Sequence, residues 1–173
     1  GFEACLEEVP EDITVLKTND TRLALAYASA SFYGNPADKL FTIGITGTKG
    51  KTTTTYMIKS VLESCGIKTG LIGTIETIIG DTSIPAKNTT PESIKIHESF
   101  AKMVEAGCRA VVMEVSSQGL KLHRTAGITF DIGVFTNLAL DHVGPDEHDS
   151  FQEYMECKAK LFSQCRLGIV NGD

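Results

Sequence analysis

The 173-residue sequence has no tryptophan, no C-x-x-C cysteine pair and no excess of positive charge. Its five scattered cysteines are typical of free thiols in a reducing cytoplasm rather than of a disulfide framework. The formal net charge of −6 argues against a nucleic-acid-binding domain, because such domains usually carry a basic face. No apolar run reaches the ~18–20 residues of a membrane span, and the N-terminus lacks a signal-peptide pattern. We therefore expect a cytoplasmic protein that binds neither nucleic acid nor membranes.

Apolar runs and helical patterns alternate from residue 40 onward. Helical patterns occupy 51–65, 91–106 and 151–165, and nearly continuous apolar runs predict buried strands at 40–46, 68–75, 108–116, 130–138 and 167–172. A short hairpin is expected over 76–85, where Gly80 and Asp81 form its turn. This order predicts an α/β fold, in which a mostly parallel sheet is wrapped by helices.

The segment before residue 40 has a different character. Residues 12–17 predict a strand, and residues 19–32 predict a helix capped by Asn19 or Asp20. The turn-rich stretch 33–39 follows, with Gly34, Asn35 and Pro36 together. We therefore place a domain boundary here, between residues 1–38 and residues 39–173.

A phosphate-binding loop is predicted between the strand at 40–46 and the helix at 51–65. The sequence GITGTKGKTTTT does not fit the generic pattern G-x-x-x-x-G-K-[ST], because Ile45 stands where the first glycine belongs. A plain glycine turn is the alternative, but Lys51 and Thr52 follow the turn directly. A lysine there can bridge phosphates, a threonine hydroxyl can hold Mg²⁺, and a helix N-terminus attracts anions. The predicted nucleotide site comprises Gly47, Thr48, Lys49, Gly50, Lys51, Thr52 and Thr53.

Several other polar residues have two readings each. Glu114 ends a buried strand, where it could cap a helix or hold Mg²⁺ beside the loop. Thr90, at the start of the helix at 91–106, could cap that helix or contact an anionic group. His142 and His148 could suggest a zinc pair, but no third ligand has suitable spacing. Lys158 would by default be a surface lysine.

The motifs together resemble those of the Mur ligases. GITGTKGKTTT resembles their ATP loop, T-G-T-x-G-K-T-T, which needs no glycine at position 45. The segments NTTPE, MEVSSQGL, TNLALDH and EYMECKAKLF then follow in the order and spacing of the family member that adds the third residue of the peptidoglycan stem peptide. The resemblance implies that residues 1–38 end the UDP-binding N-terminal domain and that residues 39–173 form most of the central ATP-binding domain. The C-terminal ligase domain would be absent, and such a fragment is expected to be inactive alone.

The resemblance also implies roles for individual residues. ATP would bind the loop with Mg²⁺ on Thr52, Glu114 and His142, and Lys51 and Lys158 would be catalytic, with Lys158 carbamylated by CO₂. The residues implied to contact UDP-N-acetylmuramoyl-dipeptide are Asn88, Thr89, Thr90, Ser116 and Arg124. The chain departs from the family at Gln118, where histidine is more common, and at Leu122, where some members have glutamine. Segment 143–150 also differs, so no role is implied for His148.

The implied activity is that of a monomeric, ATP-dependent amide-bond ligase acting through an acyl phosphate. Its substrates would be UDP-N-acetylmuramoyl-dipeptide and an amino acid, either lysine or meso-diaminopimelate. Two alternatives stay open. One is another P-loop enzyme, such as a folylpolyglutamate synthase or a small-molecule kinase. The other is a fragment that binds nucleotide without turnover.

Overall fold

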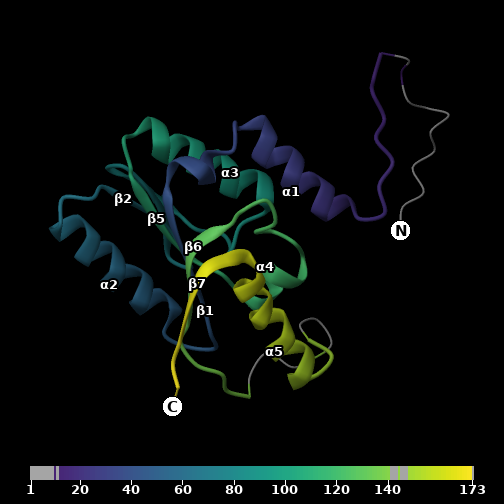
Figure 1. Ribbon diagram of the computed structural model, residues 1–173. Helices are drawn as coiled ribbons and strands as arrows, with labels where there is room; N and C mark the ends of the chain where they lie inside the picture. The colour runs from purple at the N-terminus through teal and green to yellow at the C-terminus, as the bar shows by residue number, and fades with distance from the viewer. Residues whose placement is uncertain (1–9, 11, 141–143, 145–147, 173) are drawn as a thin grey trace.

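The computed structural model describes residues 10, 12–140, 144 and 148–172. These residues form a seven-stranded sheet with the order β4-β3-β2-β5-β1-β6-β7 (Figure 1). The pairs β2–β5, β5–β1, β1–β6 and β6–β7 are parallel, whereas β3 and β4 form an antiparallel hairpin at one edge. The strands are β1 (Phe41–Thr46), β2 (Thr69–Ile72), β3 (Glu76–Ile79), β4 (Thr82–Pro85), β5 (Ala110–Glu114), β6 (Phe130–Phe135) and β7 (Cys165–Val170).

Helices cover both faces of this sheet, as the apolar strands require. The helices are α1 (Thr21–Phe32), α2 (Lys51–Ser64), α3 (Ser93–Glu105), α4 (Ser117–Lys121) and α5 (Phe151–Ala159), with the 3₁₀ turns η2 (Pro36–Lys39) and η3 (Lys160–Gln164). On one face, α2 packs Ile58 and Leu62 against the buried Ile45 of β1. On the other face, α3 contributes Phe100 and Met103 to the main core, and α1 lies beside α3 (Figure 1). The predicted α/β fold is confirmed.

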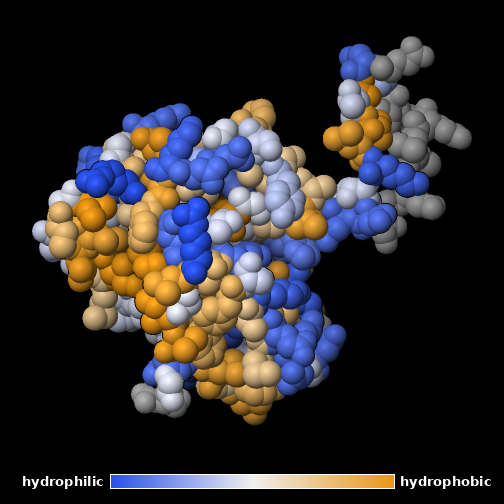
Figure 2. All heavy atoms as spheres, in the orientation of Figure 1, coloured by the Kyte–Doolittle hydropathy of each residue, from blue (hydrophilic) through white to orange (hydrophobic). Residues whose placement is uncertain are grey.

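One edge of the molecule is apolar at its surface. Figure 2 shows hydrophobic side chains gathered on the side where α2 and β7 lie. Met57 and Val61 of α2 and Leu167 and Val170 of β7 are all more than half exposed. None of the helices in the described part of the chain combines the length and the apolar character needed to cross a membrane.

Three local predictions are wrong. Residues 14–18 form no strand, and Leu16 is 86% exposed, because no neighbouring strand pairs with this segment. The helix expected at 91–106 begins at Ser93 rather than at Pro91, so Thr90 does not cap it. The helix expected at 151–165 ends as a 3₁₀ turn, and β7 begins at Cys165. The predicted cap Asp20 is confirmed, since its carboxylate accepts a hydrogen bond from the Leu23 amide.

Candidate active site

The phosphate loop connects β1 to α2 at the carboxyl end of the central strand. Gly47 has φ +144°, and an added Cβ there would overlap the Thr136 hydroxyl. Gly50, with φ +83°, is the N-cap of α2. Both residues adopt backbone conformations that favour glycine, which explains the glycine spacing. The first turn of α2 presents amide groups that lack intrahelical acceptors, as an anion site requires.

The segment after β6 holds this loop in shape. Asn137 accepts a hydrogen bond from the Thr48 amide at its carbonyl (2.9 Å) and from the Lys49 amide at its side chain (3.0 Å). The Lys49 carbonyl accepts in turn from the Asn137 amide group (3.0 Å) and from the Thr136 hydroxyl (2.8 Å). Thr136 and Asn137 belong to the motif TNLALDH, and the sequence did not predict that these two residues contact the phosphate loop. They fix the loop from the neighbouring strand end.

Two lysines converge on one carbonyl of the loop. Lys51 donates to the Gly47 carbonyl (2.9 Å) and the Thr48 carbonyl (3.1 Å), and Lys158 also donates to the Gly47 carbonyl (2.9 Å). Lys158 is only 2% exposed, and its ammonium lies 4.3 Å from the centre of the Tyr154 ring. These contacts offset part of the cost of burying an ammonium. The default reading of Lys158 as a surface lysine is therefore wrong.

Tyr154 links the helix that carries Lys158 to the phosphate loop. It is fully buried, and its hydroxyl donates to the Thr48 hydroxyl at 3.0 Å. Thr48 also accepts a hydrogen bond from the Ala139 amide (3.0 Å). The position of Lys158 is thus tied to the loop through neighbouring side chains of α5.

Glu114 is buried at the end of β5, beside the strand that leads into the loop. Its register partner is Ile45 of β1, and its side chain is 1% exposed. One carboxylate oxygen accepts from the Thr74 amide (2.9 Å), and the other accepts from the Thr74 hydroxyl (3.0 Å). A Cβ at Gly73 would lie 2.6 Å from this carboxylate, so the small residue makes room for it. Glu114 therefore does not serve as a helix cap.

A cavity of about 330 Å³ opens beside the two lysines. Its lining residues are polar or cationic, and no carboxylate is among them: Lys51, Asn88, Thr89, Thr90, Ser116, Ser117, Gln118, Arg124, His148 and Lys158. The cavity thus brings together both predicted catalytic lysines and all five predicted substrate contacts. Lys49, Thr52, Thr53 and Glu114 do not line it, and His142 lies outside the described residues. Its charge suits an anionic ligand.

Thr90 and Arg124, which are among the five predicted substrate contacts, are held by protein partners. The buried Thr90 hydroxyl donates to the Glu114 carbonyl (2.9 Å) and accepts from the Ser116 amide (2.9 Å), which joins its segment to the end of β5. Arg124 donates to the Thr90 carbonyl (3.0 Å) and pairs with Glu92 (2.6 Å). A substrate carboxylate at Arg124 would compete with Glu92.

Sequence reasoning missed the contribution of α4 and of the start of α5 to the cavity. Ser117 and Gln118 line it from α4, and His148 lines it just before α5. The His148 Nε2 is 2.9 Å from the Ser117 hydroxyl. The short helix α4 has no long apolar period, and the neighbours of His148 come from distant parts of the chain, so no local pattern marks them.

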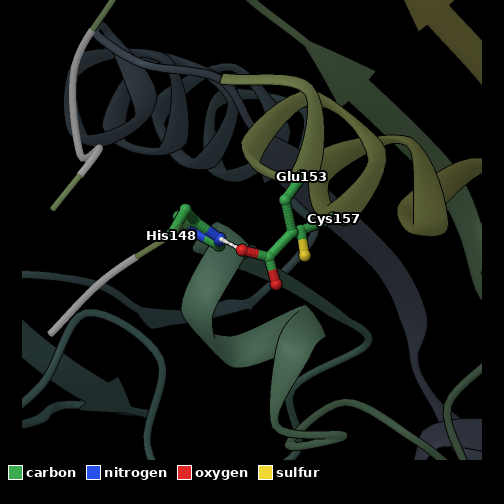
Figure 3. A group of neighbouring side chains, drawn as sticks. All are labelled: His148, Glu153 and Cys157. Atoms are coloured by element: carbon green, nitrogen blue, oxygen red, sulfur yellow. Dashed lines mark ion pairs between the residues drawn. The ribbon is translucent and has the colours of Figure 1, made fainter. Parts of the chain in front are cut away.

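The structure places three possible metal donors together: His148, Glu153 and Cys157, with donor atoms within 4.8 Å of one another (Figure 3). Glu153 pairs with Lys121 at 2.8 Å, and this hydrogen bond lowers the pKa of the Glu153 carboxyl. Burial raises the pKa of the Cys157 thiol, which disfavours the thiolate that zinc requires. We therefore assign no zinc to this group.

A glycine-turned loop at the end of a central parallel strand, two converging lysines and a cationic cavity define an α/β nucleotide-phosphate-binding domain. Residues 45–173 match the Mur ligase middle domain, and the chain belongs to the Mur ligase family.

Curated relatives support this assignment. The chain is 53% identical over 165 residues to the UDP-N-acetylmuramoyl-L-alanyl-D-glutamate–2,6-diaminopimelate ligase of Clostridium perfringens, covering 95% of this chain and 34% of the relative. It is 50% identical over 173 residues to the ligase of the same name from Clostridium tetani, covering 100% of this chain and 35% of the relative. The chain thus spans about a third of the length of these relatives.

Solved structures give the same picture of the fold. A diaminopimelate ligase of the same name superposes with a TM-score of 0.80 at 26% identity, covering 91% of this chain and 32% of that chain. A folylpolyglutamate synthase from Mycobacterium tuberculosis superposes with a TM-score of 0.62 at 16% identity, covering 86% of this chain and 41% of that chain. The second likeness concerns the fold alone.

Proposed function

We propose that this chain is the ATP-binding part of a ligase that adds meso-diaminopimelate to UDP-N-acetylmuramoyl-dipeptide. Residues 1–38 would end the UDP-binding domain, and residues 39–173 would form most of the central domain. The observation that carries the proposal is the convergence of Lys51 and Lys158 on the Gly47 carbonyl, beside a cavity without acidic lining. The names of the relatives at about 50% identity favour diaminopimelate over lysine.

The loop residues 47–53 would hold the ATP phosphates. Lys51 would leave the Gly47 and Thr48 carbonyls to neutralise the β- and γ-phosphates, since it occupies the mouth of the loop. Thr52 and Glu114, with His142, offer the hydroxyl, carboxylate and imidazole of a magnesium site, and the buried Glu114 carboxylate with its oxygens held by Thr74 fits it. Bound Mg²⁺ supplies charge neutralisation at the phosphates.

We further propose that Lys158 is carbamylated. The Lys158 ammonium would first lose a proton, the neutral amine would bond to the carbon of CO₂, and a second proton would leave the nitrogen, so that a buried cation becomes a carbamate anion beside the loop. Lys51 lies at the same Gly47 carbonyl and provides a positive charge with which a carbamate could pair. The Tyr154 hydroxyl, held at Thr48, would keep that side of α5 in position.

The cavity would receive the carboxylate end of the dipeptide. Arg124 would exchange its contact with Glu92 for a substrate carboxylate, which a planar guanidinium binds with two parallel hydrogen bonds. Ser116, Asn88, Thr89 and Thr90 supply the neighbouring polar groups. The substrate carboxylate would attack the γ-phosphorus, ADP would leave, and the amine of the incoming amino acid would displace phosphate from the acyl phosphate. The protein's part is alignment and charge neutralisation.

The full-length ligase that contains these residues tests the proposal. ADP release should require both UDP-N-acetylmuramoyl-dipeptide and meso-diaminopimelate, whereas lysine, or a folate with glutamate, should not replace them. ADP release with the folate pair, or none with the peptidoglycan precursors, would refute the proposed substrates. Lys51→Ala and Lys158→Ala should each lower kcat/KM by at least about a hundredfold. Lys160→Ala is the matched control, because Lys160 is an exposed lysine at the start of η3; this variant should leave activity unchanged.

Carbamylation has its own readout. After incubation with ¹³C-bicarbonate, the wild-type ligase should show a carbamate carbonyl signal that is lost in Lys158→Ala and kept in Lys160→Ala. A signal that survives in Lys158→Ala would place the modification elsewhere.

A further inference from the structure

His148 stands in the cavity wall close to the phosphate loop. The residue is 1% exposed, and its ring lies 5.2 Å from the ring of Tyr154, centre to centre. Tyr154 in turn bonds Thr48 of the loop and lies under the Lys158 ammonium. Tyr154 thus separates His148 from Thr48 and Lys158, the residues that would lie near the γ-phosphate. A substrate carboxylate must reach the same place to attack that phosphate.

Two contacts orient the imidazole. Its Nε2 is 2.9 Å from the Ser117 hydroxyl, and its Nδ1 is 3.7 Å from a Glu153 carboxylate oxygen (Figure 3). The same oxygen of Glu153 accepts a hydrogen bond from the Asp149 amide at 2.8 Å, so the carboxylate is itself fixed. Ser117, at 6% exposure, lines the cavity at the start of α4.

Holding α4 against α5 does not depend on His148 alone. Lys121 of α4 already pairs with Glu153 of α5 at 2.8 Å. His148 instead places a second polar contact at the cavity surface. With both ring nitrogens protonated, the imidazolium would face the Glu153 carboxylate with its Nδ1–H and donate to the Ser117 oxygen from Nε2, which would leave the hydroxyl proton of Ser117 available to the cavity.

We propose that Ser117 is a substrate-contacting residue for the reacting carboxylate and that His148 is a positioning residue that orients its hydroxyl. The inference rests on the proposed function, because it names a contact for the substrate of that same site. In it, Glu153 pairs with the imidazolium of His148, the imidazolium donates to the Ser117 oxygen, and the Ser117 hydroxyl donates to the substrate carboxylate beside Lys51 and Lys158.

Steady-state kinetics of the full-length ligase test this inference. Ser117→Ala and His148→Ala should each lower kcat/KM for UDP-N-acetylmuramoyl-dipeptide by about ten- to a hundredfold, the effect of losing one hydrogen bond to a charged group. The KM for ATP should stay unchanged in both variants. The double variant should be no worse than Ser117→Ala alone, because His148 acts through the serine.

Conservative variants separate positioning from folding. Ser117→Thr keeps the hydroxyl, and His148→Gln keeps an N–H donor near the Nε2 position, so both should recover most of the activity. His123→Ala is the control, on a histidine that pairs with Asp20 at 3.3 Å. If wild-type and His148→Ala enzymes ligate equally well, the inference fails while the proposed function stands. Independent, additive losses in the double variant, or no recovery by His148→Gln with the fold intact, would also overturn it. A wild-type ligase that does not use the dipeptide refutes the proposed function itself.

Discussion

The glycine spacing of the loop can be tested by adding one methyl group at each glycine. Gly47→Ala places a Cβ where φ is +144°, a region that only glycine adopts readily, at a cost of about 1–3 kcal/mol. The new Cβ also overlaps the Thr136 hydroxyl, whose 2.8 Å hydrogen bond to the Lys49 carbonyl is worth about 1 kcal/mol. We expect Gly47→Ala to lower the free energy of unfolding by about 2–4 kcal/mol.

Gly50→Ala provides the matched comparison. Its φ of +83° is also left-handed, but nothing lies within 4 Å of the added Cβ. The expected cost is therefore only the conformational one, about 1–2 kcal/mol. Urea unfolding of both variants of the 173-residue chain gives the difference from the midpoints at a constant m value.

Thr136→Ala identifies the origin of that difference. Removing the hydroxyl takes away the overlapping atom, so Gly47→Ala should cost less in the Thr136→Ala background than in the wild type. The recovery of stability should be partial, because the backbone nitrogen of Asn137 still lies 3.1 Å from the added Cβ. If Gly47→Ala destabilises the chain no more than Gly50→Ala does, the argument from close packing of the loop is wrong.

Three further predictions concern buried or linked side chains. Burial lowers the pKa of the His97 imidazole from its ordinary 6.5, so the unfolded state binds the proton more readily than the folded state. The free energy of unfolding should therefore fall as pH drops below about 6.5. Urea unfolding of His97→Leu should lack this part of the pH dependence. Burial and a hydrogen bond to Glu76 raise the pKa of the Tyr56 phenol to about 12, so ultraviolet titration should show one late-ionising tyrosine that disappears in Tyr56→Phe. Tyr154→Phe removes the 3.0 Å hydrogen bond to Thr48, which holds the phosphate loop in position. Losing this bond should cost about 1 kcal/mol, so the KM for ATP should rise several-fold. An unchanged KM would show that the link between α5 and the loop is dispensable.

The fold was predictable where the sequence pattern is local. Apolar runs such as 40–46 and 108–116 can be satisfied only inside a covered sheet, and the glycines at 47 and 50 mark backbone that other residues avoid. The expected strand at 12–17 failed because strand formation depends on a partner strand that the pattern does not reveal.

The site was predictable only in part. Lys51 follows from the loop motif itself, but the burial of Lys158 follows from Tyr154 and the Gly47 carbonyl, which lies 111 residues away in the chain. The same holds for His148, whose partner Ser117 is 31 residues distant. Thr90 was misplaced because a threonine before Pro91 suggests a helix cap, whereas its hydroxyl bonds the end of β5. Long-range contacts of this kind leave no periodic signal in the sequence.

The central claim is that the cavity beside Lys51 and Lys158 presents a carboxylate to the γ-phosphate of ATP. Isotope transfer tests it most directly: the full-length ligase is given UDP-N-acetylmuramoyl-dipeptide with ¹⁸O in its carboxylates, together with ATP and meso-diaminopimelate. The account predicts that one ¹⁸O atom appears in each phosphate released during ligation, because the acyl phosphate transfers its bridging oxygen. Phosphate that carries no ¹⁸O, released while the amide product forms, would contradict the account.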